Sequence, residues 1–353
     1  MKYRIAVVPG DGIGHEIVPV GMRILGAISQ QFDFALETES FEWGAGHYAK
    51  HGHFIPEDRV AEMATFDAIY FGAVGLPEVD DTLPFKLFTN LVRTRFQQYV
   101  NLRPVRLFAG IDSPLRNKTQ KDIDFVIVRE NNEGEFVQSG RQLYPDRPEG
   151  LAIDTNIVTR AGVERVARYA FALAQTRRGH LTNVTKSNTM IYTLSLWDRV
   201  IAEIAEEFPD VNYRKMYVDA ASANFVLHPE YFDVILTTNM IGDILSDLGG
   251  AIMGSLGLGG SGNINPERAF PSMFEPIHGS APDIAGQNSA NPIGQIWSGV
   301  LMLDHLGEKR AAEHLLAIAD RVTARGVRTA DLGGTAKTSD IEQLFLQEIA
   351  KAS

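Results

Sequence analysis

The sequence predicts an α/β fold built around a mostly parallel sheet. Short apolar runs that are typical of buried strands alternate with amphipathic stretches that are typical of helices. Several of the runs end in a glycine or polar turn before the next helix, as at Gly10 and at Thr238. With 353 residues, the chain is long enough for one large core or for two linked ones.

The individual elements follow from the spacing of the apolar residues. Strands are predicted at residues 5–8, 67–74, 124–129, 181–184 and 234–238. Helices are predicted at residues 11–31, 159–177, 194–208, 295–306 and 311–325. Two irregular stretches, residues 139–153 and 254–292, are rich in glycine, proline and polar residues. We expect the first stretch to be an exposed arm. The second stretch is too long to be a loop without a function in a compact domain.

Composition argues against several classes of protein. No stretch is long and apolar enough for a membrane span, and the N-terminal residues lack the pattern of a signal peptide. Cysteine is absent, which excludes disulfides and thiol chemistry, and the net charge of -11 argues against a nucleic-acid surface. We therefore expect a cytoplasmic protein that acts on a small molecule, with no nucleic acid and no membrane as partner.

Asp243 and Asp247 are the most informative pair of residues. They follow the predicted strand at 234–238 and stand four residues apart on the next predicted helix, so that both carboxylates share one face. Mg²⁺ and Mn²⁺ prefer oxygen ligands and keep positions open for a substrate. The pair therefore indicates half of a hard-cation site, and an acidic turn on a solvated helix is the alternative.

The glycine-rich turn at residues 10–14 does not fit the dinucleotide-binding loop of a Rossmann fold. A G-x-G-x-x-G pattern that starts at Gly10 requires glycine at position 15, where the chain has His15. Asp11 also places a negative charge where a pyrophosphate would dock. We interpret this segment as a tight turn that begins a helix.

Three arginines and one lysine complete the candidate site. Arginine forks bind carboxylates in bidentate fashion, so Arg93, Arg103 and Arg129 at or near strand ends suit a di- or tricarboxylate. Lys186 follows the strand at 181–184 and is a candidate general base if desolvation or a metal lowers its pKa. Taken singly, each of these residues could also be a surface charge.

Taken together, these motifs resemble those of the β-decarboxylating dehydrogenases, the isocitrate/isopropylmalate dehydrogenase family. The resemblance covers nearly the whole chain, and its most specific part is the segment at residues 274–286. Residues 185–188 and 291–299 together are most similar to the tartrate/D-malate dehydrogenase branch. The matching segments are residues 10–14, 71–75, 101–104, 128–131, 133–134, 185–188, 239–247, 274–286, 290–292 and 331–335.

The resemblance implies a role for each candidate. Arg93, Arg103 and Arg129 would hold the carboxylates of a malate-type hydroxy dicarboxylate. Lys186 and Asp219 would be the catalytic residues, and both would reach the site from the other subunit of a homodimer. In this arrangement Lys186 takes the proton of the substrate hydroxyl, and the two subunits share their active sites.

The resemblance also implies two cofactors. Mg²⁺ or Mn²⁺ would be bound by Asp219, Asp243 and Asp247, and a monovalent cation such as K⁺ is a further option. The electron acceptor would be NAD rather than NADP, because a carboxylate at position 283 accepts hydrogen bonds from the ribose hydroxyls and repels a 2′-phosphate. The residues implied to hold the adenosine half of NAD are Glu275, His278, Gly279, Ser280, Ala281, Asp283 and Asn291.

The implied fold has two domains and no Rossmann site. Residues 1–99 and 255–353 would form the large, cofactor-binding domain. Residues 100–254 would form the small domain, which carries the dimer interface and the arm at about residues 139–153.

Two departures from the family bear on the reaction. Where a tyrosine usually protonates the decarboxylated product, this chain has Phe136, which has no hydroxyl to donate; Tyr144 or solvent are the alternative donors. Thr89 and Asn90 stand on the helix that faces the C3 substituent, where apolar groups would leave polar side chains unpaired. We expect oxidation of D-malate, tartrate or a polar 3-substituted malate with β-decarboxylation, and oxidation without release of CO₂ is the alternative.

Two other classes of protein remain open from the sequence. One is a catalytically weak regulatory homologue, which Phe136 favours. The other is a dehydrogenase of the same fold that acts on a phosphorylated hydroxy-amino acid. Such enzymes typically use histidine metal ligands, and the three acids Asp219, Asp243 and Asp247 argue against this class.

Overall fold

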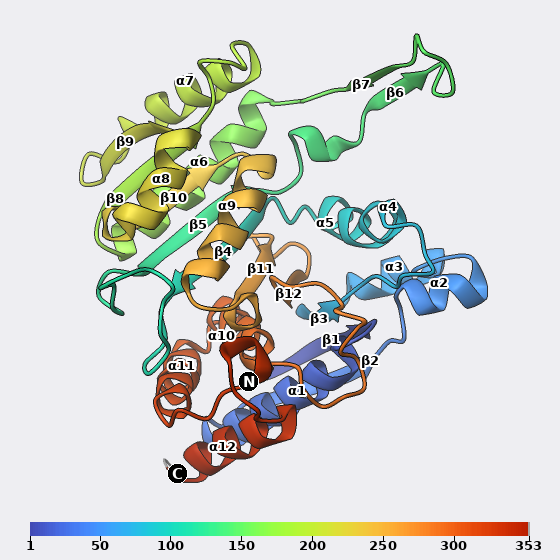
Figure 1. Cartoon of the computed structure of the whole chain (residues 1–353), viewed down its shortest axis with the longest axis vertical. Helices are drawn as coiled ribbons and strands as arrows, with labels where there is room; N and C mark the ends of the chain where they lie inside the picture. Colours follow the sequence, from blue (N-terminus) through green and yellow to red (C-terminus); the bar gives the residue numbers. More distant parts are fainter. Residues whose placement is uncertain (352–353) are drawn as a thin grey trace.

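A single large sheet runs through the molecule. The structure is a computed structural model that describes residues 1–351, and within them ten strands lie in the order β2-β1-β3-β12-β11-β4-β5-β10-β8-β9 (Figure 1). Neighbouring strands are parallel except on both sides of β11 and between β4 and β5. The predicted α/β fold with a mostly parallel sheet is therefore confirmed.

The elements have the following bounds. The strands are β1 Lys2–Gly10, β2 Ala35–Ser40, β3 Ala68–Ala73, β4 Val100–Arg106, β5 Asp124–Glu130, β6 Gly140–Leu143, β7 Leu151–Asp154, β8 His180–Thr185, β9 Asn212–Tyr217, β10 Val234–Thr237, β11 Gly260–Ile264 and β12 Ser272–Pro276. The helices are α1 Gly14–Gln31, α2 Ala45–His51, α3 Glu57–Met63, α4 Thr82–Pro84, α5 Asn90–Arg95, α6 Arg160–Thr176, α7 Thr193–Ala205, α8 Val218–Leu227, α9 Asn239–Ile252, α10 Ile293–Leu306, α11 Lys309–Thr323 and α12 Thr338–Lys351. A π-helical turn, Phe85–Thr89, joins α4 to α5.

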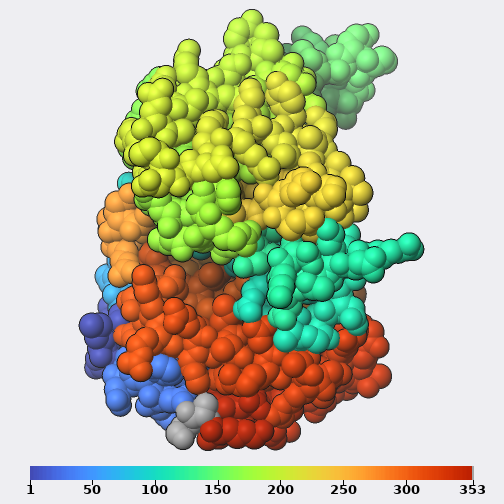
Figure 2. Space-filling model, turned by 90° about the vertical axis from the view of Figure 1, so that its left-hand side faces the viewer, coloured from blue at the N-terminus to red at the C-terminus, as the bar shows by residue number. Residues whose placement is uncertain are grey.

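Segments from both ends of the chain lie in the same half of the molecule. Helix α1 packs against α12, and β3 pairs in parallel with β12, where Ala68 faces Ser272. Figure 2 shows this half in blue and orange-red, with the middle of the chain in green and yellow above it. The boundaries at residues 99/100 and 254/255 stay a prediction, because one sheet continues across them.

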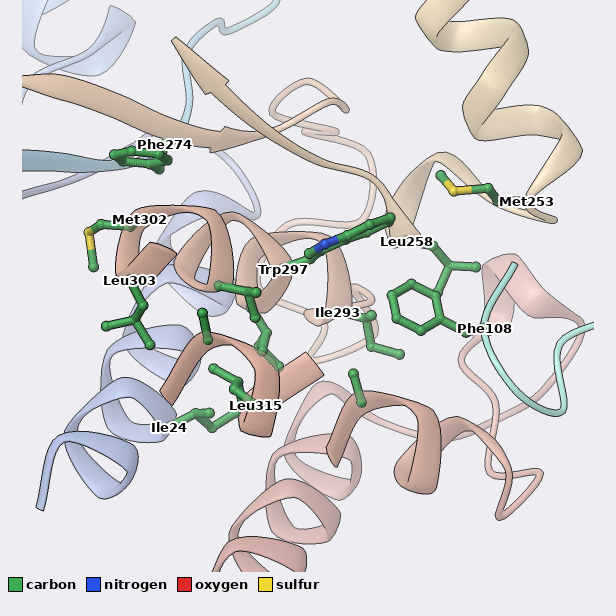
Figure 3. Packing of buried hydrophobic residues seen from close by; sticks show 14 of the residues in the cluster. Ile24, Phe108, Met253, Leu258, Phe274, Ile293, Trp297, Met302, Leu303 and Leu315 are labelled. Atoms are coloured by element: carbon green, nitrogen blue, oxygen red, sulfur yellow. The ribbon is translucent and has the colours of Figure 1, made fainter. Parts of the chain in front are cut away.

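The largest buried core surrounds helix α10. Trp297 lies at its centre, and its ring meets the edge of Phe108 with ring centroids 5.0 Å apart (Figure 3). The same cluster contains Val105 of β4 and Phe125 of β5, so it extends from the chain-end half into the strands of the other half. This shared core holds β4 and β5, which carry two of the candidate arginines, in a fixed position relative to β12.

The first helix begins three residues later than predicted, at Gly14, because Asp11 belongs to the preceding turn. Its carboxylate accepts hydrogen bonds from the backbone N–H groups of Ala45, Gly46 and Gly75 at 2.7, 2.9 and 3.0 Å. The N–H groups of the turn itself, which a phosphate would need, are also occupied, since those of Ile13 and Gly14 donate to the backbone oxygens of Ser280 and Asp11 at 2.8 and 3.0 Å. This explains physically why the glycine turn is not a Rossmann loop.

Two stretches without a clear pattern contain strands. Residues 140–154 form the hairpin of β6 and β7, which projects from the body of the molecule at the upper right of Figure 1. The stretch at residues 254–292, which looked irregular, contains β11 and β12. Gly260 lies so close to helix α10 that a Cβ atom would approach the backbone nitrogen of Ser298 to 2.8 Å. Close packing here selects glycine, which removes the apolar signature of a strand.

Candidate active site

The three candidate arginines meet in one cleft of about 220 Å³. Arg93 comes from α5, Arg103 from β4 and Arg129 from β5, and all three are buried. Asp243 of α9 and Glu275 of β12 line the same cleft. We call this cavity the arginine cleft. Its other lining residues are Phe71, Ala73, Val74, Phe85, Thr89, Phe136, Pro276, Ile277, His278 and Gly279.

Arg129 is held rigidly by the first turn of α9. Its side chain is 1% exposed, and its Nε and Nη2 atoms donate to Oδ1 of Asn239 at 2.9 and 2.7 Å. Its Nη1 atom donates to the carboxylate of Asp243. Only glycine fits at position 242, since a Cβ atom there would lie 2.6 Å from Cγ of Arg129. The predicted acidic motif therefore also binds and orients the side chain of Arg129.

The surroundings of Asp243 and Asp247 shift their pKa values in opposite directions. Burial disfavours the charged form of Asp243, but the charges of Arg129 and Arg103 outweigh it and keep its pKa below the ordinary range. Burial raises the pKa of Asp247, and Arg103, 3.8 Å away, offsets this only in part. Asp243 is thus ionised at neutral pH and able to act as a metal ligand.

The cleft has unsatisfied donors that face no acceptor of the protein. The Nε atoms of Arg93 and Arg103 are buried and find no hydrogen-bond partner within residues 1–351. Buried donors of this kind are rare and usually indicate a missing water, ion or ligand. The positive charges of the three arginines also equal in number the negative charges of Asp243, Asp247 and Glu275. A divalent cation bound together with a dicarboxylate dianion would leave this net charge unchanged.

Lys186 and Asp219 lie apart from the arginine cleft of their own chain. They follow β8 and begin α8, respectively, and form an ion pair with each other. The side chain of Asp219 is 67% exposed, and its hydrogen bond from Lys186 lowers its pKa. Within residues 1–351 no three acidic or histidine side chains are arranged to hold a metal ion. One chain therefore brings together Asp243 and Asp247, but not the third predicted ligand.

The predicted cofactor residues spread over three adjoining hollows. Glu275, His278 and Gly279 line the arginine cleft, Ser280 lines a neighbouring hollow of about 730 Å³, and Asp283 lines a third of about 800 Å³. Thr89 is shared by the first two hollows, and Pro282 by the second and third. The hollows thus form a path from the arginines to Asp283 that suits an elongated ligand.

Ala281 and Asn291 are placed differently from the other predicted cofactor residues. Ala281 lies in the turn before Asp283 with a positive φ of 40°. Asn291 donates to Asp331 at 3.0 Å and accepts from the N–H of Ile293 at 3.0 Å, at the start of α10. These contacts fasten the loop that carries Asp283 to the body of the protein.

The two predicted specificity residues differ in position. Thr89, the last residue of the π-helical turn, is buried and lines the arginine cleft, whereas Asn90 is not among its lining residues. A π-helical turn shifts the register of the residues that follow it, and such turns are frequent at functional sites. The structure therefore gives Thr89, but not Asn90, direct access to a bound molecule.

Phe136 lines the cleft at the position where the resemblance leads us to expect a tyrosine. The guanidinium of Arg129 lies over its ring at 4.9 Å, and the ring of Phe85 meets it edge-on at 5.2 Å. Tyr144 lies on the projecting hairpin, is 58% exposed and contacts Arg147. Within one chain, Tyr144 does not line the arginine cleft.

Sequence reasoning did not identify three polar residues that support the arginines. Asn239 and Ser246 lie within the acidic motif of α9, where their spacing from Asp243 could have indicated a role. Ser246 accepts a hydrogen bond from Arg103 at 2.5 Å and donates to the backbone oxygen of Asp243 at 2.8 Å. Asn263 lies within the glycine-rich β11, where no sequence signal marked it.

Buried arginines beside carboxylates on a mostly parallel sheet define an enzyme site for a small anionic substrate. The family model for isocitrate/isopropylmalate dehydrogenase matches residues 4–345. The chain therefore belongs to the isocitrate/isopropylmalate dehydrogenase family. It is an oxidoreductase that acts on CH–OH donors, as predicted.

Three relatives illustrate this membership. The chain is 48% identical over 351 residues to the probable tartrate dehydrogenase/decarboxylase of Agrobacterium vitis, covering 99% of this chain and 98% of the relative. It is 47% identical to the decarboxylating D-malate dehydrogenase of Escherichia coli strain K12, covering 99% of both chains. The crystal structure of isocitrate dehydrogenase from Methylococcus capsulatus is similar, with a TM-score of 0.88, 32% identity and coverage of 98% and 99%. As for membranes, no helix within residues 1–351 is long and apolar enough to cross one.

Proposed function

We propose that this protein oxidises a malate-type 2-hydroxy dicarboxylic acid with NAD and a divalent metal ion, with β-decarboxylation, in the cytoplasm. The observation that carries the proposal is the meeting of three buried arginines with Asp243 in a cleft of about 220 Å³. This volume suits a four-carbon diacid. The names of the relatives from Agrobacterium vitis and Escherichia coli, which act on tartrate and D-malate, support the same class of substrate.

The arginines would bind the two carboxylates of the substrate. Arg93 and Arg103 each keep a buried Nε donor without a partner among the residues described, and Arg129 is fixed by Asn239 and Asp243. Charge-assisted hydrogen bonds to carboxylates are roughly twice as strong as neutral ones, and a planar fork also fixes orientation. Substrate held in this way would present its C2 hydroxyl toward the carboxylate of Asp243.

The metal and NAD would be held by residues that the chain already places. Asp243 and Asp247 supply two oxygen ligands, and Asp219 of the partner subunit would supply a third. When bound, the divalent ion acts as a Lewis acid that lowers the pKa of the hydroxyl, and NAD accepts the hydride. Lys186 of the partner subunit would remove the hydroxyl proton.

A homodimer is supported by exposed apolar side chains beside these residues. Leu227 on α8 and Ile244 on α9 are 61% and 63% exposed, and Leu151 and Ile153 on the projecting hairpin are also exposed. Large apolar groups gathered on a few elements indicate a protein interface. Asp219, the partner of Lys186 in an ion pair, lies on α8 together with Leu227, which fits a site completed by a second subunit.

A substrate panel tests the proposed function directly. Purified protein is assayed with NAD, Mg²⁺ or Mn²⁺, and D-malate, both tartrates, and alkylated or polar 3-substituted malates, while NADH and CO₂ are followed together. We expect turnover with D-malate or a tartrate that a strong chelator abolishes. Metal-independent turnover, or no turnover with any member of the panel, would contradict the proposal.

A second outcome, oxidation without release of CO₂, is favoured by Phe136, because that ring lines the cleft without a hydroxyl. We expect Phe136→Tyr to raise the ratio of CO₂ to NADH, or the rate of CO₂ release, by about tenfold or more, since a general acid typically contributes about 10²- to 10⁴-fold. Phe85→Tyr is the matched control, because it adds the same hydroxyl to the neighbouring ring of the cleft. One CO₂ per NADH in the wild type and no change in Phe136→Tyr would show that another group donates the proton.

The third hollow predicts the choice between NAD and NADP. Asp283, Glu16 and Glu78 line it, and no Lys or Arg is among its lining residues. A 2′-phosphate would meet like charges and find no cation, which we expect to lower kcat/KM for NADP by about 10²- to 10⁴-fold relative to NAD. Asp283→Asn keeps the shape of the side chain and removes its charge. The ratio of kcat/KM for NAD to kcat/KM for NADP should therefore fall by about tenfold. Equal kcat/KM values for NAD and NADP in the wild type would refute the assignment.

A further inference from the structure

Three buried asparagines meet beneath the arginine cleft. Asn101 comes from β4, Asn263 from β11, and Asn131 from the loop after β5. All three side chains are almost completely buried. Asn101 and Asn131 both donate through Nδ2 to Oδ1 of Asn263, at 2.7 and 3.0 Å. Their meeting point lies in the antiparallel middle of the sheet, where β11 and β4 stand between its two parallel parts.

These contacts determine which way the amide of Asn263 points. An asparagine side chain has an acceptor oxygen on one side and a donor nitrogen on the other. Because two neighbouring amides occupy the oxygen, the nitrogen of Asn263 must face the opposite side. There it donates to Oε1 of Glu275 at 2.7 Å. The same Oε1 atom accepts a hydrogen bond from Nη2 of Arg93 at 3.0 Å.

The arrangement is costly as a purely structural element. The Oδ1 atoms of Asn101 and Asn131 are buried and have no hydrogen-bond partner among the residues described. Each unsatisfied buried acceptor costs stability, and apolar residues of similar shape would avoid that cost. A function for the network accounts for its retention. The network is connected through Glu275 to Arg93, and so to the arginine cleft.

We propose that Asn263 is a positioning residue that fixes Glu275 and thereby aims Arg93 at a substrate carboxylate. The inference rests on the proposed function, because it takes Arg93 as a carboxylate ligand. The carboxylate of Glu275 has to stay on the side of Arg93, and the donor nitrogen of Asn263 is what holds Oε1 there. Asn101 and Asn131 act one step further away, by setting the orientation of Asn263.

Asn263→Asp gives a sharp test because it keeps the shape of the side chain and replaces one hydrogen-bond donor, the Nδ2 atom, with an acceptor oxygen. The new carboxylate still accepts from Asn101 and Asn131, but its second oxygen replaces a donor next to Glu275. Two carboxylates at this separation share one proton, and burial and like charge raise the pKa of the pair, whereas Arg93 and Arg103 nearby oppose that rise. Below this raised pKa the shared proton restores the bridge, and above it the two charges repel.

The expected result is a pH dependence that the wild type lacks. From about pH 6 to about pH 8.5, KM of Asn263→Asp for D-malate should rise by tenfold or more relative to the wild type, since a hydrogen bond between charged groups is lost. Its kcat should change less than its KM for D-malate. Unaltered KM for D-malate across this range would overturn the proposal.

Asn265→Asp is the matched control. Asn265 is equally buried just after β11, but it donates to the backbone oxygen of Gln97, and within residues 1–351 it forms no hydrogen bond with Glu275. Its variant should lose stability without the pH-dependent rise in KM. A similar rise in both variants would mean that loosened packing, rather than the position of Glu275, causes the effect.

A structural readout separates this inference from the proposed function. If the wild type turns over no member of the substrate panel, the proposed function fails by itself. Crystal structures of Asn263→Asp at about pH 6 and about pH 8.5 then decide the positioning role. We expect the contact between Arg93 and Glu275 at the lower pH and its loss at the higher pH, and a contact retained at both would overturn the role of Asn263.

Discussion

Replacing Asp243 with asparagine is expected to lower kcat by about 10³-fold or more and to abolish the dependence of activity on Mg²⁺ or Mn²⁺. A bound metal ion stabilises charge in the transition state by several kcal/mol, and about 1.4 kcal/mol corresponds to a tenfold change in rate. The change removes a charged ligand whose pKa the arginines keep low. The amide oxygen of the variant can still accept from Arg129, so the fold should persist. The measurements are kcat over a titration of metal and metal binding by calorimetry.

Asp320→Asn is a suitable control for the loss of a carboxylate paired with arginine. Asp320 forms an ion pair with Arg106 on α11 and β4, outside the arginine cleft, and is partly buried like Asp243. We expect it to shift thermal stability and to leave metal affinity unchanged. Normal, metal-dependent turnover by Asp243→Asn would show that Asp243 is not a ligand of the metal.

Lys186→Met is expected to lower kcat by about 10²- to 10⁴-fold with little change in KM for the hydroxy acid. General-base catalysis contributes an amount of this size, and the proton is removed only in the chemical step. Methionine keeps the length of the side chain and removes its charge. Lys215→Met is the control, because the partly exposed Lys215 pairs with Asp198 as Lys186 pairs with Asp219. A large rise in KM with unchanged kcat would indicate a binding role instead.

Mixing the two inactive variants tests whether subunits share their sites. In a hybrid dimer of Lys186→Met with Asp243→Asn, one site combines an intact Asp243 with an intact Lys186 from the other subunit, and the other site is doubly defective. After random exchange half of the dimers are hybrids, so about one quarter of wild-type activity should return. No recovery after confirmed exchange would place both residues in the site of a single chain.

Parts of the site with charged chemistry could be predicted from the sequence, and parts that depend on packing could not. Arg129 lies near the end of β5 and Asp243 near the start of α9, where chain direction alone brings them toward one edge of the sheet. Arg103 lies in the middle of β4, and only the fold shows that it reaches the same cleft. After the π-helical turn Thr89 lines the cleft and Asn90 does not, and single-residue changes of register have no sequence signature. The cofactor role of Glu275 stays a prediction, and its ion pair with Arg93 is a contact that no sequence pattern indicated.

The fold shows the same division. Apolar strands such as β3 and β10 and the amphipathic helix α6 were predicted within a few residues of their bounds. The strand β11 has a single large apolar residue, because helix α10 packs too closely for side chains at Gly260. Its identity as a strand is therefore determined by neighbours far along the chain. Asn263, which lies on that strand, could not be recognised before the fold was known.

The pairing of β3 with β12 has a consequence for how the protein is made. Ala68 and its partner Ser272 are separated by about 200 residues of chain. At the usual rate of synthesis, about 5–20 residues per second, the ribosome needs on the order of 10–40 s to deliver the partner strand. During that time the nascent β3 offers an open, apolar edge to any other strand. We therefore expect nascent chains to be prone to pair with one another through β3 until translation is almost complete.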